Sequence, residues 1–380
     1  GSRLTIAMAN AFNMVAAKPS PEPSSHHMPS SPTGPKITNF DLVRLFAAFQ
    51  VAVIHAYHRF DMAVPWFVEP LAHFPGVPIF FIISGYLISA SLERSNGLDI
   101  YARHRALRIF PGLWGVLCAT LVALVVFGFA APTLPFVGWF VAQCIGLIYT
   151  PGFLADFGDG TYNGSLWTIP IELQFYVMLP ILYWIARRLR IELTRFLVLA
   201  FLAFVTLGGC LVLLFPQLGV DDAGSFVKLV RYTFAPRFYM FLFGVLLQRM
   251  HIQDAQLIRG KGPYWVAACL LLGYFGPKGG LNYMGSELLL GLTAISMAYT
   301  VPTLSARLLR GTDVSYGLYL YHGLIINILI ELAFPGNGVT LMLTILFSVI
   351  AATLSWFLIE RPVLRAKWLR MWSLRRAAGT

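Results

Sequence analysis

The chain has 380 residues, of which 57% are hydrophobic and only 12% are charged, and its formal net charge is +11. Soluble domains carry about a quarter charged residues, so this composition excludes an ordinary soluble protein and indicates a helical protein that crosses a membrane several times. The positive charge does not require nucleic acid as a partner, because Lys and Arg accumulate in the cytoplasmic loops of membrane proteins. We therefore expect the lipid bilayer as a partner and no nucleic acid.

The first 39 residues differ from the rest of the chain. They contain KPSPEPSSHHMPSSPTGPK, a stretch too rich in Pro and Ser to fold alone. We expect a disordered cytoplasmic tail over 1–39, a membrane domain over 40–362 and a basic cytoplasmic tail over 363–380. The four cysteines stand singly in apolar segments, and their spacing indicates neither a metal site nor a disulfide framework.

A transmembrane helix needs about 20 mostly apolar residues. Eleven runs approach that length: 40–60, 74–92, 111–131, 135–150, 168–187, 195–216, 228–249, 263–277, 284–302, 316–334 and 339–359. Loops rich in Arg and Lys should be cytoplasmic, and the acidic loops at 61–69, 156–159 and 221–222 should lie outside. The chain then crosses an odd number of times between Arg105 and Asp156, so 111–131 and 135–150 cannot both span.

The run 135–150 is the shorter of the two and begins at Pro135. We interpret it as an interfacial or re-entrant segment. The sequence thus predicts an all-α polytopic membrane protein with about ten transmembrane helices and both termini in the cytoplasm.

The first run, DLVRLFAAFQVAVIHAYHRF, carries ionisable groups that are costly inside a membrane and often mark functional sites. Arg44 and His55 share one helical face within about 20° and lie about 16 Å apart along the axis. Asp41 can pair with Arg44 one turn later. The alternative is an arginine that reaches the interface and a histidine that only packs.

Two segments between the first and third runs are polar. In PIFFIISGYLISAS, Ser84 precedes Gly85, and small residues of this kind first indicate close packing of helices. The hydroxyls of Ser84 and Tyr86 become candidates for the site only because the neighbouring spans are also polar. Residues 94–110 suit an amphipathic helix on the inner surface. The charge rule explains Arg105 and Arg108 there, but they can equally bind the phosphates of a coenzyme.

The fourth span begins SLWTIPIELQFY, Ser165 to Tyr176. Glu172 should reach about the depth of His55. A carboxylate that accepts a hydrogen bond from one imidazole nitrogen raises the basicity of the other, as a general base requires. Glu172 can instead be the structural partner of another polar group, so the pairing with His55 is a hypothesis.

The ninth span begins SYGLYLYHGLII and places Ser315, Tyr319 and His322 on one helical face near the cytoplasm. Tyrosines are common at membrane interfaces, whereas a histidine inside an apolar run is harder to explain by packing alone.

Taken in order, these motifs resemble the acyltransferase-3 family of integral membrane acyltransferases. The resemblance rests on R-x10-H at Arg44 and His55, FFIISGYLIS, the RIFPGLW segment that ends at Trp114, SLWTIPIELQFY, SYGLYLYH and a terminal ERP at 360–362. The family includes bacterial O-acetyltransferases of O-antigen and exopolysaccharide, and macrolide acyltransferases.

The resemblance implies transfer of an acyl group, usually acetyl, from cytoplasmic acyl-CoA to a hydroxyl of an acceptor, without a metal. By position, His55 is the catalytic histidine and Glu172 occupies the family's acidic position after SLW. We expect Arg44, Arg105, Arg108 and His322 to bind the donor. The residues expected to contact substrate or support the site are Asp41, Ser84, Tyr86, Ser165, Trp167, Tyr176 and Tyr319.

We expect a carbohydrate acceptor such as O-antigen, exopolysaccharide or a lipid-linked sugar, and a location in the cytoplasmic (inner) membrane. His55 either deprotonates the acceptor hydroxyl or carries the acyl group itself. The alternatives are a macrolide or secondary-metabolite acyltransferase and, in a different class, a polytopic transporter. The oligomeric state is left open.

Overall fold

The computed structural model describes residues 39–95, 97–215, 230, 232–277 and 279–366, and every regular element in these ranges is helical. The all-α prediction is confirmed. The helices are α2 Phe40–Arg59, α3 Gly76–Glu93, α4 Leu98–Val126, α5 Leu134–Cys144, α6 Thr168–Arg188, α7 Leu193–Leu214, α9 Phe238–Arg249, α10 Gly262–Phe275, α11 Leu281–Ala298, α12 Leu304–Leu309, α13 Ser315–Glu331 and α14 Gly338–Ser355. The expected tails, apart from the residues next to the membrane domain, and the acidic loop at 221–222 lie outside the described residues.

Short helical turns join some of these helices. Three are 3-10 turns, Glu69–His73, Gly152–Leu154 and Ile252–Asp254, and a π-helical turn Trp356–Glu360 follows α14 directly.

Six described segments are long and apolar enough to cross a membrane: Phe40–Arg59, Glu69–Glu93, Leu98–Val126, Thr168–Arg188, Leu193–Leu214 and Gly338–Ala366. Each of the eleven predicted runs contains a helix, but several of these helices are shorter than a span requires, so the predicted number of ten is not confirmed. The 11 residues of α5 extend about 16 Å, roughly half the hydrocarbon thickness.

One predicted boundary is wrong. The amphipathic helix expected over 94–110 is not a separate element, because α4 begins at Leu98 and runs unbroken through Pro111 for 29 residues. Proline is tolerated inside membrane helices, and here Pro111 is buried. Two positions before it, the hydroxyl of Tyr316 on α13 donates to the carbonyl oxygen of Ile109 at 2.9 Å, which joins α13 to α4 beside the proline.

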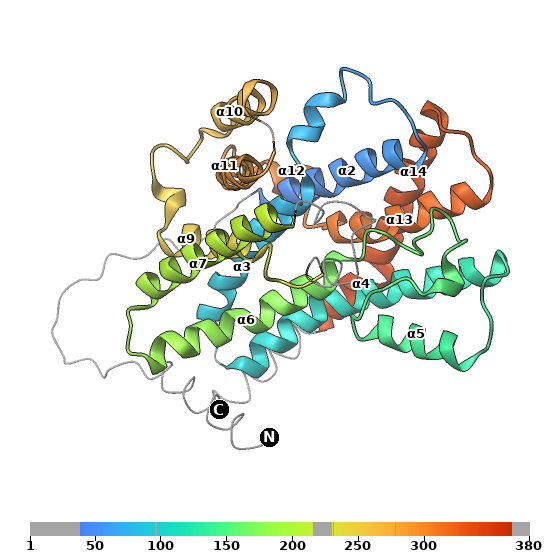
Figure 1. Ribbon diagram of the computed structural model, residues 1–380, viewed down its shortest axis with the longest axis horizontal. Coiled ribbons are helices and arrows are strands. Elements are labelled where there is room, and N and C mark those ends of the chain that lie inside the picture. The colour runs from blue at the N-terminus through green and yellow to red at the C-terminus, as the bar shows by residue number, and fades with distance from the viewer. Residues whose placement is uncertain (1–38, 96, 216–229, 231, 278, 367–380) are drawn as a thin grey trace.

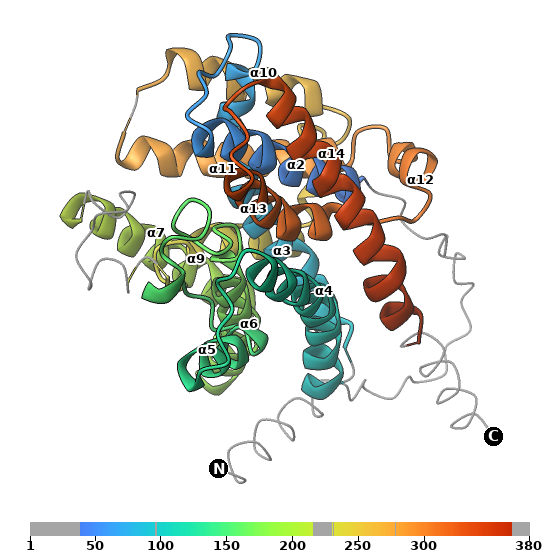
Figure 2. The same cartoon turned by 90° about the vertical axis from the view of Figure 1, so that its right-hand side faces the viewer.

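Helices α2, α3 and α13 form the centre of the bundle, and both views show α10 and α11 on one side of it and α5 on the other (Figures 1 and 2). Most of α13 is buried. By contrast, α7 buries only Leu197, Gly208 and Gly209. A helix that is apolar all round and so exposed suits contact with lipid.

Helices α3 and α9 cross with their backbones in contact. A Cβ atom at Gly85 would lie 1.9 Å from the carbonyl oxygen of Phe241, and one at Gly244 would lie 2.0 Å from that of Ile82. Only glycine permits so close an approach. Packing is therefore the role of Gly85, as its sequence neighbourhood predicts.

Candidate active site

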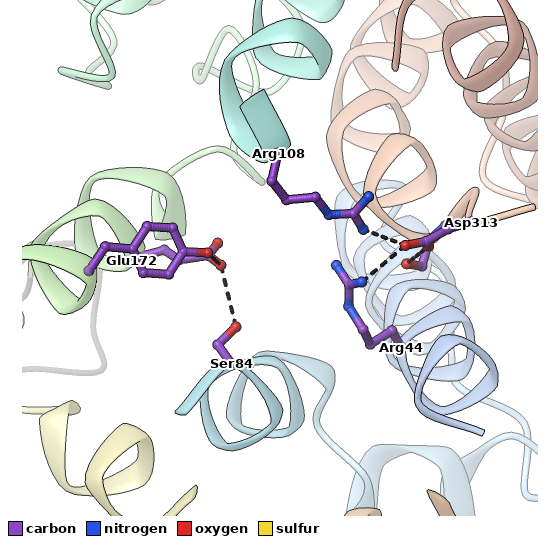
Figure 3. Close-up of polar contacts among 7 residues, drawn as sticks. Arg44, Ser84, Arg108, Glu172 and Asp313 are labelled. Carbon is purple, nitrogen blue, oxygen red and sulfur yellow. Dashed lines mark hydrogen bonds and ion pairs between the residues drawn. The ribbon is translucent and has the colours of Figure 1, made fainter. Parts of the chain in front are cut away.

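Two arginines from different helices share one carboxylate oxygen. Nη1 of Arg44 on α2 lies 3.0 Å from Oδ2 of Asp313, and Nη2 of Arg108 on α4 pairs with the same oxygen (Figure 3). The other oxygen, Oδ1, accepts from the backbone N–H of Ser315 at 3.2 Å and from its hydroxyl at 2.5 Å. Asp313 therefore joins the start of α13 to both α2 and α4.

The Asp313 carboxylate stays charged in this setting. Burial alone would raise its pKa, but the guanidinium groups of Arg108 and Arg44 oppose that effect and hold the pKa well below its usual range. Two guanidinium groups therefore share one directly paired carboxylate in this arginine cluster, Arg44, Arg108 and Asp313.

Arg105 lies one turn before Arg108 on α4 and is less completely paired. Its Nη2 donates to Ser91 Oγ at 3.3 Å, and its guanidinium carbon lies 5.9 Å from the ring centre of Tyr176. Its buried Nε has no hydrogen-bond partner in the described part of the chain. Arg105 therefore retains donor capacity for an anion.

Glu172 on α6 lies opposite the arginine cluster. Its Oε1 accepts from Ser84 Oγ on α3 at 3.3 Å and from the hydroxyl of Tyr176. Figure 3 shows Glu172 and Ser84 on one side and Arg44, Arg108 and Asp313 on the other. The structure therefore brings together three of the residues predicted to belong to the site, on α3 and α6.

Both groups line one pocket of about 90 Å³, which is bounded by Arg44, Arg105 and Arg108, by Ser84, Glu172 and Tyr176, and by apolar side chains. Its wall on α3 extends from Val77 to Ile88, which is about 16 Å of helix. The volume is sufficient for a group the size of a phosphate or a short acyl chain. We call this space the donor pocket.

His55 and His322 form a pair beyond one end of the donor pocket. Nδ1 of His55 lies 3.0 Å from Nε2 of His322, and the Nδ1 of His322 lies 3.2 Å from the carbonyl oxygen of Leu318. His322 is fully buried. The two rings come from α2 and α13, which places a pair of imidazoles in the centre of the bundle.

Tyr319 lies between the donor pocket and the histidine pair. Its side chain lines the pocket, and its ring centre is 5.8 Å from that of His322. The hydroxyl donates to the carbonyl oxygen of Ser165 at 2.7 Å and therefore accepts from Thr168 Oγ1 at 2.8 Å. The Tyr319 side chain thus contacts both the pocket and the histidine pair.

Two of the predicted pairings differ from those observed. The structure does not bring Glu172 to His55: among the described residues, His55 bonds to His322 and Glu172 bonds to Ser84 and Tyr176. Arg44 pairs with Asp313 rather than with Asp41, which lies on the first turn of the same helix.

His322, expected near the cytoplasm and among the residues that bind the donor, contacts His55 in the structure. Asp313, just before α13, already lies beside Arg44. His322 follows Ser315 by seven positions, which is about 10 Å along a helix. The residue therefore lies beside His55, deeper in the bundle than the arginine cluster.

Three further predicted residues lie away from the donor pocket. The hydroxyl of Tyr86 bonds to Gln253 at 2.8 Å and contacts that of Tyr299 at 2.9 Å. Trp167 lies with its ring centre 4.7 Å from the guanidinium carbon of Arg237. Ser165 contributes its carbonyl oxygen to Tyr319. These residues support the surrounding packing.

Sequence reasoning missed Asp313. Its only signal is its place two residues before Ser315, where an aspartate before an apolar run is typical of a helix N-terminus. In the structure, Asp313 accepts from the backbone N–H of Ser315, the first residue of α13, and also pairs with two arginines from α2 and α4.

Comparison with known proteins agrees with the character of the site. Residues 37–361 match the acyltransferase-3 family, which is described as an acyltransferase domain. The chain is 31% identical to nodulation protein 10 of Rhizobium leguminosarum bv. viciae over 385 residues, covering 92% of this chain and 96% of that protein. It is 25% identical to an O-acetyl transferase of Shigella phage Sf6 over 340 residues, covering 86% of this chain and 95% of that protein. No solved structure matches.

Proposed function

This chain belongs to the acyltransferase-3 family and is a multi-pass membrane O-acyltransferase, and we propose that it moves an acyl group, acetyl in the first instance, from cytoplasmic acyl-CoA to a carbohydrate hydroxyl. The family assignment supports the reaction class. The donor, the acceptor and the roles of individual residues are part of the proposal.

One observation carries the proposal: α2 lines the donor pocket with Arg44 and holds His55 in the histidine pair beyond it. The arginine cluster offers two guanidinium groups that share one carboxylate, and Arg105 adds a third guanidinium whose Nε has no hydrogen-bond partner among the described residues. Guanidinium groups bind phosphate through paired, charge-assisted hydrogen bonds. We assign this end of the pocket to a phosphate-bearing donor such as acyl-CoA.

The acyl end of the donor would then point along the pocket toward Tyr319, which also contacts the histidine pair. His55 takes the proton of the acceptor hydroxyl as that oxygen attacks the thioester carbonyl carbon. The carbon–sulfur bond breaks, and the leaving thiolate receives the proton from His55. In the competing route, the His55 nitrogen attacks the carbonyl first and passes the acyl group to the acceptor in a second step.

Acetyl transfer to a hydroxyl acceptor is supported by the O-acetyl transferase name of one relative and by the acyl chemistry of the family, and a carbohydrate as that acceptor is part of the proposal. We place the protein in the cytoplasmic membrane of a bacterium, with both termini on the cytoplasmic side and about ten spans. Mass spectrometry of glycans and lipids from cells with and without the protein identifies the acceptor through the acetyl groups that are lost.

The direct test uses proteoliposomes that contain the purified protein, radiolabelled acetyl-CoA and the acceptor so identified. His55→Ala should abolish transfer, and His58→Ala should not, because His58 is exposed three positions later on the same helix. Turnover retained by His55→Ala would overturn the catalytic assignment. Transport without acceptor-dependent thioester cleavage would instead support a transporter. Intact-mass analysis without acceptor shows whether an acyl-histidine accumulates.

A further inference from the structure

The hydrogen bonds of the histidine pair have a defined direction. The carbonyl oxygen of Leu318 can only accept, so the Nδ1 of His322, 3.2 Å away, must carry the hydrogen of that bond. A neutral imidazole has one N–H, so the Nε2 of His322 is then a lone pair. It accepts a hydrogen bond from the Nδ1–H of His55 at 3.0 Å.

The opposite assignment requires a charged His322. If His55 accepted at Nδ1, then His322 would need hydrogens on both nitrogens and would be an imidazolium. His322 has no exposed surface, and its hydrogen bonds in the described chain go to a backbone carbonyl and to another imidazole, not to a carboxylate. An unpaired buried charge is strongly unfavourable, so the neutral pair is the resting state.

We propose that His322 is a positioning residue that fixes the tautomer of His55, with the hydrogen on Nδ1 and the lone pair on Nε2. This inference rests on the proposed function, in which His55 is the base. Among the described residues, the His55 ring bonds only through Nδ1. Its Nε2, on the opposite side of the ring, is left for the acceptor hydroxyl.

The backbone that holds His322 is itself restrained. The side chain of Asn163 donates to the carbonyl oxygen of Leu320 at 2.9 Å, and its Oδ1 would lie 2.3 Å from a Cβ at Gly323. Tyr319 is held on the same turn by Ser165. The segment from Asn163 to Ser165 thus packs directly against the turn of α13 that carries His322, and holds the backbone of that turn in place.

The arrangement serves the reaction by stabilising one intermediate charge. When the acceptor O–H bond breaks, the proton goes to Nε2 of His55, which becomes an imidazolium. Its Nδ1–H still donates to the lone pair on Nε2 of His322, and this hydrogen bond stabilises the positive charge of the His55 imidazolium. The Nε2 proton then passes to the coenzyme sulfur, and the pair returns to its neutral state with no proton transferred to His322.

Three variants of His322 separate positioning from packing. A Gln side chain places its amide oxygen near the position of Nε2, whereas Asn places its oxygen near Nδ1 and Leu offers no acceptor. His322→Gln should keep kcat within about tenfold of wild type. His322→Asn and His322→Leu should lose about 10³- to 10⁴-fold in kcat, the scale of losing a tautomer-fixing partner in a Ser-His-Asp triad. KM for acetyl-CoA should change by less than about twofold in all three.

The tautomer of His55 can be determined without an activity assay. The chain has eight histidines, so ¹⁵N-histidine labelling of the full protein, with His55→Asn to assign the His55 signals, shows which nitrogen carries hydrogen. We expect Nδ1–H in the wild type and loss of that preference in His322→Leu. If a variant does not fold, the wild-type spectrum and the Gln variant still decide.

An Nε2–H tautomer of His55 in the wild type would overturn the inference, as would His322→Leu with wild-type kcat. These outcomes differ from failure of the proposed function. If His55→Ala retains turnover, then His55 is not the base whatever its tautomer. If His55→Ala is inactive but His322→Leu is fully active, only the positioning role fails.

Discussion

Arg44 Nη1 lies 3.0 Å from Asp313 Oδ2 although 269 positions separate the two residues in the chain. A second polar contact, between His55 and His322, joins the same two parts of the fold. The earlier residue of α2, Arg44, contacts Asp313 just before α13, and the later one, His55, contacts His322 within α13. Because residue numbers increase together in the two contacts, α2 and α13 run in the same direction. That agrees with the direction predicted for the first and ninth spans.

Asp313→Asn should weaken this arrangement by removing the shared counter-charge. The side chains of Arg44 and Arg108 are each only 19% exposed, and removing one partner of a buried ion pair costs about 3 kcal/mol or more. We expect a lower midpoint of thermal unfolding in detergent and a higher KM for acyl-CoA, because the arginines lose their fixed positions.

Asp61→Asn is the matched control, since Asp61 is an exposed aspartate at a positive φ that Asn also accepts. The assignment of Asp313 fails if the two variants unfold at the same temperature.

The stability difference between wild type and Asp313→Asn should depend on pH. Burial raises the pKa of Asp313, but Arg108 and Arg44 lower that pKa by more than burial raises it, so it lies well below its usual range. A carboxyl with a lower pKa when folded contributes stability above its unfolded pKa of about 4 and loses it as the pH falls toward the folded value. The difference between the two midpoints should therefore be constant at neutral pH and decline in acid.

Differential scanning fluorimetry in detergent from about pH 8 to about pH 3 measures that difference, because the unfolded carboxyl titrates within this range. A difference that grows on acidification contradicts the assignment.

Within the first run, the sequence alone predicted much of what matters. The 3.6-residue repeat placed Arg44 and His55 on one face, and α2 indeed directs both toward α13. Ser84, Glu172 and Tyr176 were each expected at the site from polar motifs on two separate runs, but their mutual contact was not predicted and comes from the structure.

Other contacts could not be predicted, because hydropathy gives the depth of a residue but not which helices are neighbours. Glu172 and His55 were expected at similar depths, yet α13 supplies the partner of His55. Asp313 carries the signal of a helix start, which hides its pairing with two arginines. The bond from the hydroxyl of Tyr316 to the carbonyl oxygen of Ile109 joins α13 to α4 across 207 positions, and no local pattern predicts it.

Arg105→Gln should raise the KM for acyl-CoA by about tenfold with little change in kcat, because a lost charge-assisted hydrogen bond costs about 1.5–3 kcal/mol. Arg105 lines the donor pocket, and its Nε has no hydrogen-bond partner in the part of the chain that the structure describes. Steady-state kinetics with varied acetyl-CoA at saturating acceptor measures the changes in KM and kcat separately.

Arg103→Gln provides the comparison for Arg105. It removes the same charge from an exposed position two residues earlier on α4 and should leave both constants unchanged. Equal effects at positions 103 and 105 would indicate general electrostatic attraction rather than a contact inside the pocket.

The crossing of α3 and α9 predicts a strict requirement for glycine next to the site. In Gly85→Ala and Gly244→Ala the new methyl group would meet a backbone carbonyl at 1.9 and 2.0 Å, and backbone cannot move aside as a flexible side chain does. Overpacking of a fitted core costs about 1–3 kcal/mol, and separating two backbones should cost at least that much. Each variant should unfold at a lower temperature, and Gly85→Ala should also lose activity, because its neighbour Ser84 holds Glu172.

Gly285→Ala on α11 is the control, since its added methyl group would meet no neighbouring atom of the described residues within 4 Å and alanine favours a helix over glycine by about 1 kcal/mol. Wild-type stability in both crossing variants would show that α3 and α9 are not in backbone contact.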